Sequence, residues 1–399
     1  MLTITIFAAT YAVIAFGRIP GLRIDRTGAA LLGGALMVAT GAIPLEEAYR
    51  AIDWNTIALL LGMMIVVAHL RLAGFFALAT AWAVSRARRP LALLAAIVVL
   101  AGGLSAFLVN DTICIVLTPL VLDIVLHLRR NPVPYVLAVP LAANIGGAAT
   151  LTGNPQNMIV GSLSGIPYAT FAADVAPVAA IGLLLTIALL ALLWRGEFLS
   201  GARLAAEPPP WRTDRKLLRK TAAVAALMAV AFFAGVPPAE AALLAGAVLL
   251  ATRRLRPARI WAEIDWPLLV MFAGLFVVVA GLERATLSPE RIAAIAALGL
   301  HHMPTLGLVT AALSNLVSNV PAVLVLKPFV ATLPDPERAW TVVAATATLA
   351  GNLTLVGSVA NLIVVQRARA RGVEIGFWTY LAAGAPLTLL TIIVALALL

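Results

Sequence analysis

Apolar stretches of about 20 residues recur along the whole chain, from Leu2 to Leu399, and each can cross a bilayer as a helix. Hydrophobic residues make up 62% of the 399 positions and charged residues 12%, against about 50% and about 25% in soluble domains. The gaps between the apolar stretches are too short for a soluble domain. The sequence therefore predicts an all-α polytopic membrane protein that forms one membrane domain.

The formal charge of +10 lies in short clusters between the apolar stretches. Lys and Arg gather on cytoplasmic loops of membrane proteins, so these clusters predict which loops face the cytoplasm. A nucleic acid partner would need a continuous solvated basic face, which this distribution excludes. The clusters hold 23 of the 28 basic residues and lie at 18–26, 71–89, 129–130, 195–220, 253–259 and 367–371.

Two pairs of apolar runs do not fit an up-and-down count of spans. The runs 91–108 and 112–126 meet at the polar residues 110–111, yet both outer ends are basic and so lie on the same side. A re-entrant helical hairpin over about 91–127 satisfies this, because polar backbone at membrane depth must be enclosed by protein or a water-filled cavity. We expect a matching hairpin from the opposite side over about 303–333.

Three segments recur in the same order along the chain, which predicts an internal repeat. The matches are 52–54 with 264–266 at an offset of 212, Asn110 and Pro119 with Asn319 and Pro328 at 209, and 150–160 with 354–364 at 204. By the loop assignment, the helix after Asp53 starts outside and the helix after Asp265 starts inside. We therefore expect two inverted-topology repeats, at 1–195 and 219–399, joined by a cytoplasmic linker at 196–218.

The third match places Gly, Asn, Ser and Thr inside spans that are otherwise rich in Ala, Leu and Val. We expect a broken transmembrane helix over about 132–166 and another over about 339–370. Inverted halves with broken helices are typical of secondary transporters. Freed carbonyls at such breaks can coordinate a cation such as Na⁺, and the N-termini of half-helices can hold an anion.

The hairpin tips and the breaks resemble those of the ion transporter superfamily, which includes arsenite efflux pumps, NhaD-type sodium/proton antiporters and divalent anion/sodium symporters. The resemblance covers nearly the whole chain. It implies a scaffold and a mobile transport domain that works as an elevator, often in a homodimer, in the inner (plasma) membrane of a bacterial or archaeal cell. The motifs that carry it are Val109-Asn110-Asp111-Thr112, Gly153-Asn154-Pro155-Gln156-Asn157, Val317-Ser318-Asn319-Val320-Pro321, Gly351-Asn352-Leu353-Thr354 and Gly357-Ser358-Val359-Ala360-Asn361.

One departure from the family bears on the substrate. Each tip resembles Ser-Asn-Thr in the dicarboxylate branch, whereas the tips here read Asn110-Asp111-Thr112 and Ser318-Asn319-Val320. An aspartate would repel a dianion unless it is protonated or paired with a cation. The first tip is closer to the arsenite-pump branch, so we expect proton-coupled efflux of arsenite or a related small oxyacid. A soluble arsenite ATPase subunit is a further partner that this branch implies.

Two alternatives stay open within the transporter class: sodium-coupled uptake of a di- or tricarboxylate or other anion, and sodium/proton antiport. An ion channel would not need paired, inverted breaks. An enzyme is not expected, because the sequence lacks a His-Glu-x-x-His run and a Gly-x-Ser-x-Gly run. Apart from H⁺ or Na⁺ as a coupling ion, the sequence suggests no cofactor.

Asp111 is the most informative single residue, because an ionisable side chain inside a membrane is costly and so marks a functional candidate. It either binds the coupling proton or ion, or it caps the second hairpin helix. The amides at the tips and breaks either bind substrate and ions or glue helices together by hydrogen bonds. The candidate substrate and ion ligands are Asn110, Asp111, Thr112, Thr152, Gly153, Asn154, Asn157, Ser318, Asn319, Asn352, Thr354, Gly357, Ser358 and Asn361.

Overall fold

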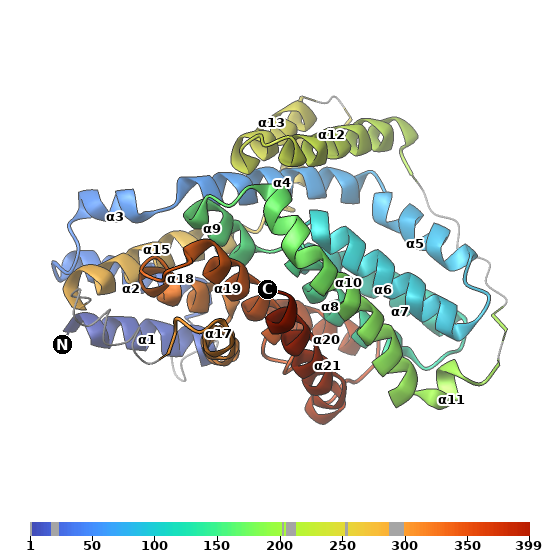
Figure 1. The fold of residues 1–399 in the computed structure, drawn as a ribbon. Helices are drawn as coiled ribbons and strands as arrows, with labels where there is room; N and C mark the ends of the chain where they lie inside the picture. The colour runs from blue at the N-terminus through green and yellow to red at the C-terminus, as the bar shows by residue number, and fades with distance from the viewer. Residues whose placement is uncertain (1, 17–23, 202, 205–212, 252–253, 287–298) are drawn as a thin grey trace.

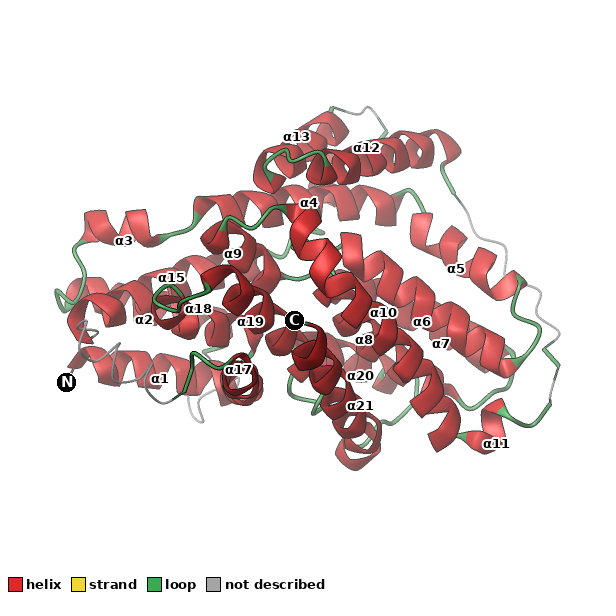
Figure 2. Cartoon of the chain, viewed as in Figure 1, coloured by secondary structure: helices red, strands yellow, loops and turns green. Residues whose placement is uncertain are grey.

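A computed structural model describes the chain except for residues 1, 17–23, 202, 205–212, 252–253 and 287–298. Every element in the described part is a helix, as Figures 1 and 2 show. Six of these helices are long and apolar enough to cross a membrane, namely α4 (Trp54–Leu72), α6 (Pro90–Phe107), α7 (Asn110–His127), α10 (Tyr168–Leu193), α15 (Trp266–Thr286) and α21 (Phe377–Leu398). The expectation of an all-α polytopic membrane protein is confirmed. The inverted orientation of two repeats stays a prediction.

The helices of the first half of the chain run from the N-terminus to the first residues of the linker. They are α1 (Leu2–Phe16), α2 (Arg26–Ala39), α3 (Leu45–Ala51), α4 (Trp54–Leu72), α5 (Phe75–Ser85), α6 (Pro90–Phe107), α7 (Asn110–His127), α8 (Pro132–Ala148), α9 (Pro155–Ser164), α10 (Tyr168–Leu193) and α11 (Arg195–Phe198).

The helices of the second half follow the linker, part of which lies outside the described residues. They are α12 (Arg215–Phe233), α13 (Pro238–Leu250), α14 (Pro257–Trp261), α15 (Trp266–Thr286), α17 (Met303–Val317), α18 (Asn319–Val330), α19 (Pro336–Ala350), α20 (Val359–Arg369) and α21 (Phe377–Leu398).

The repeated Ile-Asp-Trp triplets mark two helix starts. Asp53 caps α4, where its Oδ1 accepts hydrogen bonds from the backbone N–H groups of Asn55 (3.0 Å) and Thr56 (3.3 Å). Asp265 acts in the same way at α15, where its Oδ1 accepts from the Leu268 N–H at 3.1 Å. Aspartate is a favoured cap because its carboxylate satisfies N–H groups that lack an intrahelical partner.

Two close helix crossings recur at the same offset of 212 residues. A Cβ on Gly62 of α4 would lie 2.6 Å from the carbonyl oxygen of Ala242 in α13, and a Cβ on Gly274 of α15 would lie 2.5 Å from that of Ala30 in α2. Glycine is required at both positions because the facing atoms are backbone, which cannot move aside. Small residues allow such close approach of membrane helices. Each crossing joins one helix of the first half to one of the second.

The segments that the sequence singles out fall in one region, where α6 and α7 lie beside α8 and α10, while α17 to α20 lie between them and α1 (Figure 1). Only residues 108–109 separate α6 from α7, and only Ser318 separates α17 from α18. Non-helical breaks at 149–154 and 351–358 separate α8 from α9 and α19 from α20. Four short interruptions of the helices, two tips and two breaks, therefore lie inside the bundle.

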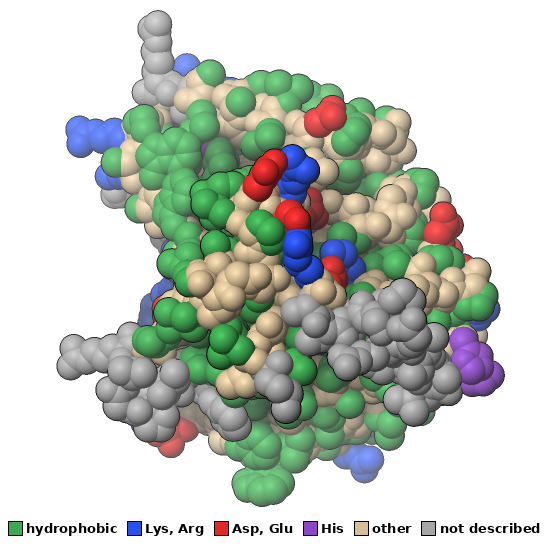
Figure 3. Space-filling view, turned by 90° about the vertical axis from the view of Figure 1, so that its left-hand side faces the viewer, with side chains coloured by type: hydrophobic (Ala, Val, Ile, Leu, Met, Phe, Trp, Pro, Cys, Tyr) green, Lys and Arg blue, Asp and Glu red, His purple; other side chains and the backbone are tan. Residues whose placement is uncertain are grey.

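At the end of the molecule that carries α3, acidic and basic side chains group together between hydrophobic surfaces (Figure 3). Two ion pairs belong to this end. Arg50 pairs with Glu46 within α3 at 2.6 Å, and Arg284 of α15 pairs with Glu47. The Arg50–Glu46 pair is about three-quarters exposed on both sides, so it contributes little to stability.

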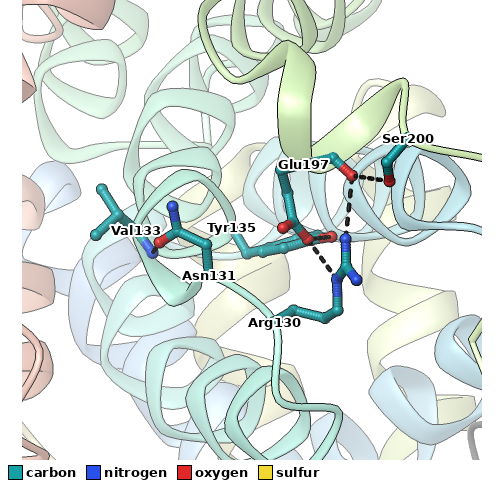
Figure 4. A network of polar contacts seen from close by, with 6 residues as sticks. All are labelled: Arg130, Asn131, Val133, Tyr135, Glu197 and Ser200. Atoms are coloured by element: carbon teal, nitrogen blue, oxygen red, sulfur yellow. Dashed lines mark hydrogen bonds and ion pairs between the residues drawn. The ribbon is translucent and has the colours of Figure 1, made fainter. Parts of the chain in front are cut away.

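The start of the linker is anchored by a more enclosed network, drawn in Figure 4. The Arg130 Nε lies 2.7 Å from Glu197 Oε1, which also accepts from the Tyr135 hydroxyl at 2.9 Å. The Arg130 Nη2 donates to the Glu197 carbonyl oxygen at 3.2 Å. Hydrogen bonding to Glu197 holds the pKa of Arg130 above its ordinary value. This network fixes α11 to the loop between α7 and α8.

Replacing Glu197 with Gln should lower the free energy of unfolding by about 1–3 kcal/mol, because a half-buried guanidinium loses its charged partner. Thermal unfolding of the purified protein measures this effect. Arg50→Gln is the matched control, because it breaks the exposed Arg50–Glu46 pair and should cost less than about 1 kcal/mol. Equal shifts for the two variants would contradict an anchoring role for Glu197.

Candidate functional site

A cavity of about 220 Å³ lies where the hairpin tips and the helix breaks meet α2 and α15. One wall comes from α1, α2 and the start of α15, and includes Arg26, Thr27 and Asp265. The other wall comes from the first residues of α7, α9, α18 and α20 and their caps. Its polar residues are Asn110, Asp111, Gln156, Ser318, Asn319 and Ser358.

Helix N-termini converge on this cavity. Those of α9 and α20 are closed by the side chains of Asn154 and Ser358, which accept hydrogen bonds from the N–H groups of Asn157 and Ala360. The N-termini of α7 and α18, at the two tips, have no side-chain cap from any residue that the structure describes. An uncapped N-terminus offers free N–H groups and the positive end of the helix dipole to a ligand's oxygen atoms.

The second tip is held in a strained conformation. Ser318 has φ 79° and ψ 159°, a region that almost only glycine adopts. Such a residue costs about 1–3 kcal/mol and persists only where its surroundings fix it. Strain of this kind is typical of ligand clamps and switch regions, which agrees with the position of Ser318 in the cavity wall.

Asp111 lies in the first turn of α7 and makes no hydrogen bond or ion pair in the described part of the chain. The interpretation of Asp111 as a helix cap is therefore wrong, because Val109 occupies the cap position and no side chain bonds there. The cavity also holds the carboxylate of Asp265 and the guanidinium of Arg26, which likewise forms no ion pair. Two carboxylates and one cation thus face a single small volume.

Five of the sequence-predicted ligands line this cavity: Asn110, Asp111, Ser318, Asn319 and Ser358. Most of the others are buried in contacts of their own. Thr152 shares a 2.8 Å hydrogen bond with the Tyr168 hydroxyl. The Asn352 Nδ2 donates to the Leu141 carbonyl oxygen at 3.0 Å. Thr112 is half-buried and does not line the cavity.

The other predicted ligands build the breaks. The Asn157 Nδ2 donates to the carbonyl oxygens of Gly147 (3.3 Å), Ala148 (3.2 Å) and Thr150 (2.9 Å). The Asn361 Nδ2 donates to those of Gly351 (2.8 Å) and Thr354 (3.0 Å), at the offset of 204 residues. Because unsatisfied carbonyls are costly in a membrane, these two amides are what allows each helix to break.

Glycines complete the breaks by close approach. The Gly153 carbonyl oxygen accepts from the N–H of Asn110 at 3.0 Å, and a Cβ on Gly153 would lie 2.2 Å from the Gly147 oxygen. A Cβ on Gly357 would lie 2.8 Å from the Asn315 Oδ1. Asn154 donates from Nδ2 to the Gly147 oxygen at 3.0 Å. These residues shape the site without lining it.

Sequence reasoning missed Asn144, which is fully buried in α8 and links the two halves. Its Nδ2 donates to Asn352 Oδ1 at 2.8 Å and to Asn361 Oδ1 at 3.2 Å, and its Oδ1 accepts from Asn110 Nδ2 at 2.9 Å. Arg26 and Thr27 were missed as site residues too. Gln156 and Asp265 stood inside recognised motifs, so their positions could have indicated them.

The family model described as a citrate transporter, CitMHS, matches residues 11–348 of this chain. A 46 kDa membrane protein of Mycobacterium leprae is 32% identical over 99% of this chain and 97% of its own length. The silicon efflux transporter LSI3 of Oryza sativa is 28% identical over 98% and 96%. The putative transporter arsB of Dictyostelium discoideum is 24% identical over 94% and 87%.

The fold is similar to that of a solved structure, the YdaH transporter of Alcanivorax borkumensis. The TM-score is 0.64 at 17% sequence identity, and the match covers 100% of this chain and 95% of that one. At this identity the similarity bears on the fold alone. The relatives whose names state a function are transporters, and the match to them extends over nearly the whole chain.

Proposed function

This chain belongs to the CitMHS citrate transporter family, and from that premise we propose that it is a secondary transporter that exports a small neutral oxyacid in exchange for protons. Arsenous acid, the undissociated form of arsenite at neutral pH, is the substrate that we put first. The observation that carries the proposal is the unpaired carboxyl group of Asp111, which lines the cavity beside the uncapped N-terminus of α7. An unpaired ionisable group at such a site is suited to carry a proton.

The charges of the cavity favour a neutral substrate over a dianion. Asp111 and Asp265 both line the cavity, and Arg26 is the one cation among the described residues that line it. A doubly charged carboxylate would meet two like charges there unless both were neutralised. A neutral oxyacid can donate hydroxyl protons to the carboxylates and accept hydrogen bonds from the helix N-termini. The names of the rice and Dictyostelium relatives, a silicon efflux transporter and arsB, support a substrate of this class.

An elevator movement agrees with the two walls of the cavity. We assign α1, α2, α4, α12, α13 and α15 to the scaffold, and α6–α9 and α17–α20 to the moving part. A second cavity of about 670 Å³ has on its scaffold side Asn55, Thr56, Leu59, Pro238 and Ala239. These residues match Pro267, Leu268, Met271, Arg26 and Thr27 of the first cavity at the offset of 212. The scaffold thus offers two equivalent surfaces, which is what two alternating positions of the moving part require.

Expression in a strain that lacks its own arsenite exporter tests the substrate. We expect the wild-type chain to raise the arsenite concentration that the cells survive, and to do so without a soluble ATPase subunit. A resistance gain that requires such a subunit would change the energy source in the proposal. No gain, together with sodium-dependent uptake of citrate, would overturn the proposal.

Sodium-coupled uptake of a carboxylate is the second candidate. The Ser105 Oγ and the Asn110 Oδ1 are buried and have no hydrogen-bond partner among the described residues, and such neutral oxygens can ligate Na⁺. The description of the family as citrate transporters also favours it.

We place the protein in the inner membrane of a bacterial or archaeal cell, as a homodimer. These assignments, like the coupling ion, are part of the proposal.

A further inference from the structure

Gln156 is a buried residue of the cavity wall, and its side-chain amide is hydrogen-bonded to Thr348. The Gln156 Nε2 donates to Thr348 Oγ1 at 3.0 Å. The Gln156 side-chain oxygen makes no hydrogen bond in the described part of the chain. It differs from the unpaired atoms there that are fully enclosed, such as Ser105 Oγ, because it keeps some accessible surface. It is therefore left open to the cavity.

The orientation of the Thr348 hydroxyl follows from backbone groups. Asn157 Nδ2 must face the carbonyls of the break, which turns its Oδ1 toward Thr348 at 3.3 Å. Asn154 Nδ2 donates to the Gly147 oxygen and to Thr348 Oγ1 at 3.2 Å. The hydroxyl has one proton, which lies between the Ala344 oxygen (2.8 Å) and Asn157 Oδ1. Its lone pairs accept from Asn154 and Gln156, so Gln156 can present only its N–H₂ group to Thr348.

Thr348 is the counterpart of Asn144 at the offset of 204 residues. Each of the two residues lies in the half-helix before one break and bonds to side chains of the other break. Both are fully buried, and both have all their hydrogen-bonding groups engaged. The side chains of Asn144 and Thr348 are therefore held in one orientation. Each in turn orients a cavity residue that bonds to it, Asn110 in the first case and Gln156 in the second.

We propose that Thr348 is a positioning residue that turns the Gln156 amide oxygen into the cavity, where it accepts a hydrogen bond from an undissociated hydroxyl group of the substrate. Together with Asp111 and Asp265, this oxygen makes a region of acceptors. A protonated oxyacid satisfies such a region, whereas a carboxylate oxygen meets only lone pairs there. The inference deepens the proposed function and rests on it for the class of substrate.

Arsenite transport by reconstituted Thr348→Val tests the hydroxyl, because valine keeps the shape of threonine. We expect KM for arsenite to rise about tenfold with kcat within about twofold, since only ligand binding loses an oriented acceptor. Thr348→Ser should restore KM to within about threefold. Thr346→Val is the matched control: Thr346 is equally buried in α19, but within the described part of the chain its hydroxyl bonds only to the Val342 carbonyl oxygen. It should leave KM unchanged.

A double-mutant cycle keeps the test valid if one variant is poorly folded. Gln156→Leu alone should raise KM by about the same factor as Thr348→Val, and the double variant should be no worse than Gln156→Leu. Additive effects, or a serine variant as impaired as the valine variant, would overturn the positioning role. If the wild type transports citrate and neither arsenite nor silicic acid, the proposed function and the substrate class both fail. The same cycle measured with citrate would then still decide whether Thr348 acts through Gln156.

Discussion

Asp111→Asn should abolish proton-coupled transport, with a loss on the order of 10²-fold, while the protein still folds. Asparagine has the size of aspartate and keeps one amide oxygen in the cavity, but it cannot take up and release a proton. The carboxyl group has no partner in the described part of the chain, so its replacement breaks no contact. Arsenite uptake into inverted vesicles, whose interior corresponds to the outside of the cell, would show loss of both rate and pH dependence when measured over a range of pH.

Asp123→Asn is the matched control for this prediction. Asp123 lies in the same helix, α7, but it pairs with Arg371 and does not line the cavity. The same substitution there should leave the pH profile as it is and change transport by less than about twofold, since a half-exposed ion pair contributes little. An Asp111→Asn variant that keeps the wild-type pH profile would contradict the assignment of the proton to Asp111.

Gly146→Ala should prevent stable folding of the bundle. A Cβ on Gly146 in α8 would lie 2.1 Å from the carbonyl oxygen of Gly102 in α6, and both neighbouring backbone atoms of Gly102 lie within 2.5 Å. No side-chain movement relieves this clash, so α6 and α8 must separate. Overpacking of this kind costs about 3 kcal/mol or more. We expect a clear drop in melting temperature, or aggregation, in size-exclusion chromatography of heated samples.

Gly103→Ala is the control, one residue from the contact. A Cβ on Gly103 would meet no atom within 4 Å, so alanine should be tolerated or stabilise α6 slightly. Equal loss of folded protein in the two variants would show that α6 is sensitive to any substitution rather than to its approach to α8.

The interruptions of the helices could be predicted from the sequence, because each contains polar residues or glycine within an otherwise apolar span. Polar residues inside apolar spans cost free energy in a membrane and therefore mark candidate functional or structural positions. The tips at Asn110 and Ser318 do line the cavity. The sequence pattern could not distinguish a residue that lines the cavity from one that stabilises the helix break. Asn157 and Asn361 stand in the same motifs as the cavity residues, yet their amides are used by the carbonyls of the breaks.

The rest of the site depends on which helices cross. Asp265 is visible in the sequence as a helix cap, and Arg26 as one of a basic cluster. Only the packing of α15 on α2 brings both to the cavity. Asn144 and Thr348 are single polar residues in apolar half-helices, without a motif around them. The comparison of the two halves at the offset of 204 pairs them, but their contacts across the halves appear only in the fold.

The most direct test of the account is the movement of protons when arsenite moves. Proteoliposomes loaded with arsenite, with equal pH on both sides and no sodium, are diluted into arsenite-free buffer, and a trapped dye reports the internal pH. Export of arsenite in exchange for protons predicts acidification of the interior in liposomes with wild-type protein, and none in liposomes with Asp111→Asn. Arsenite efflux without a pH change, or efflux that occurs only when sodium is added, would contradict proton exchange.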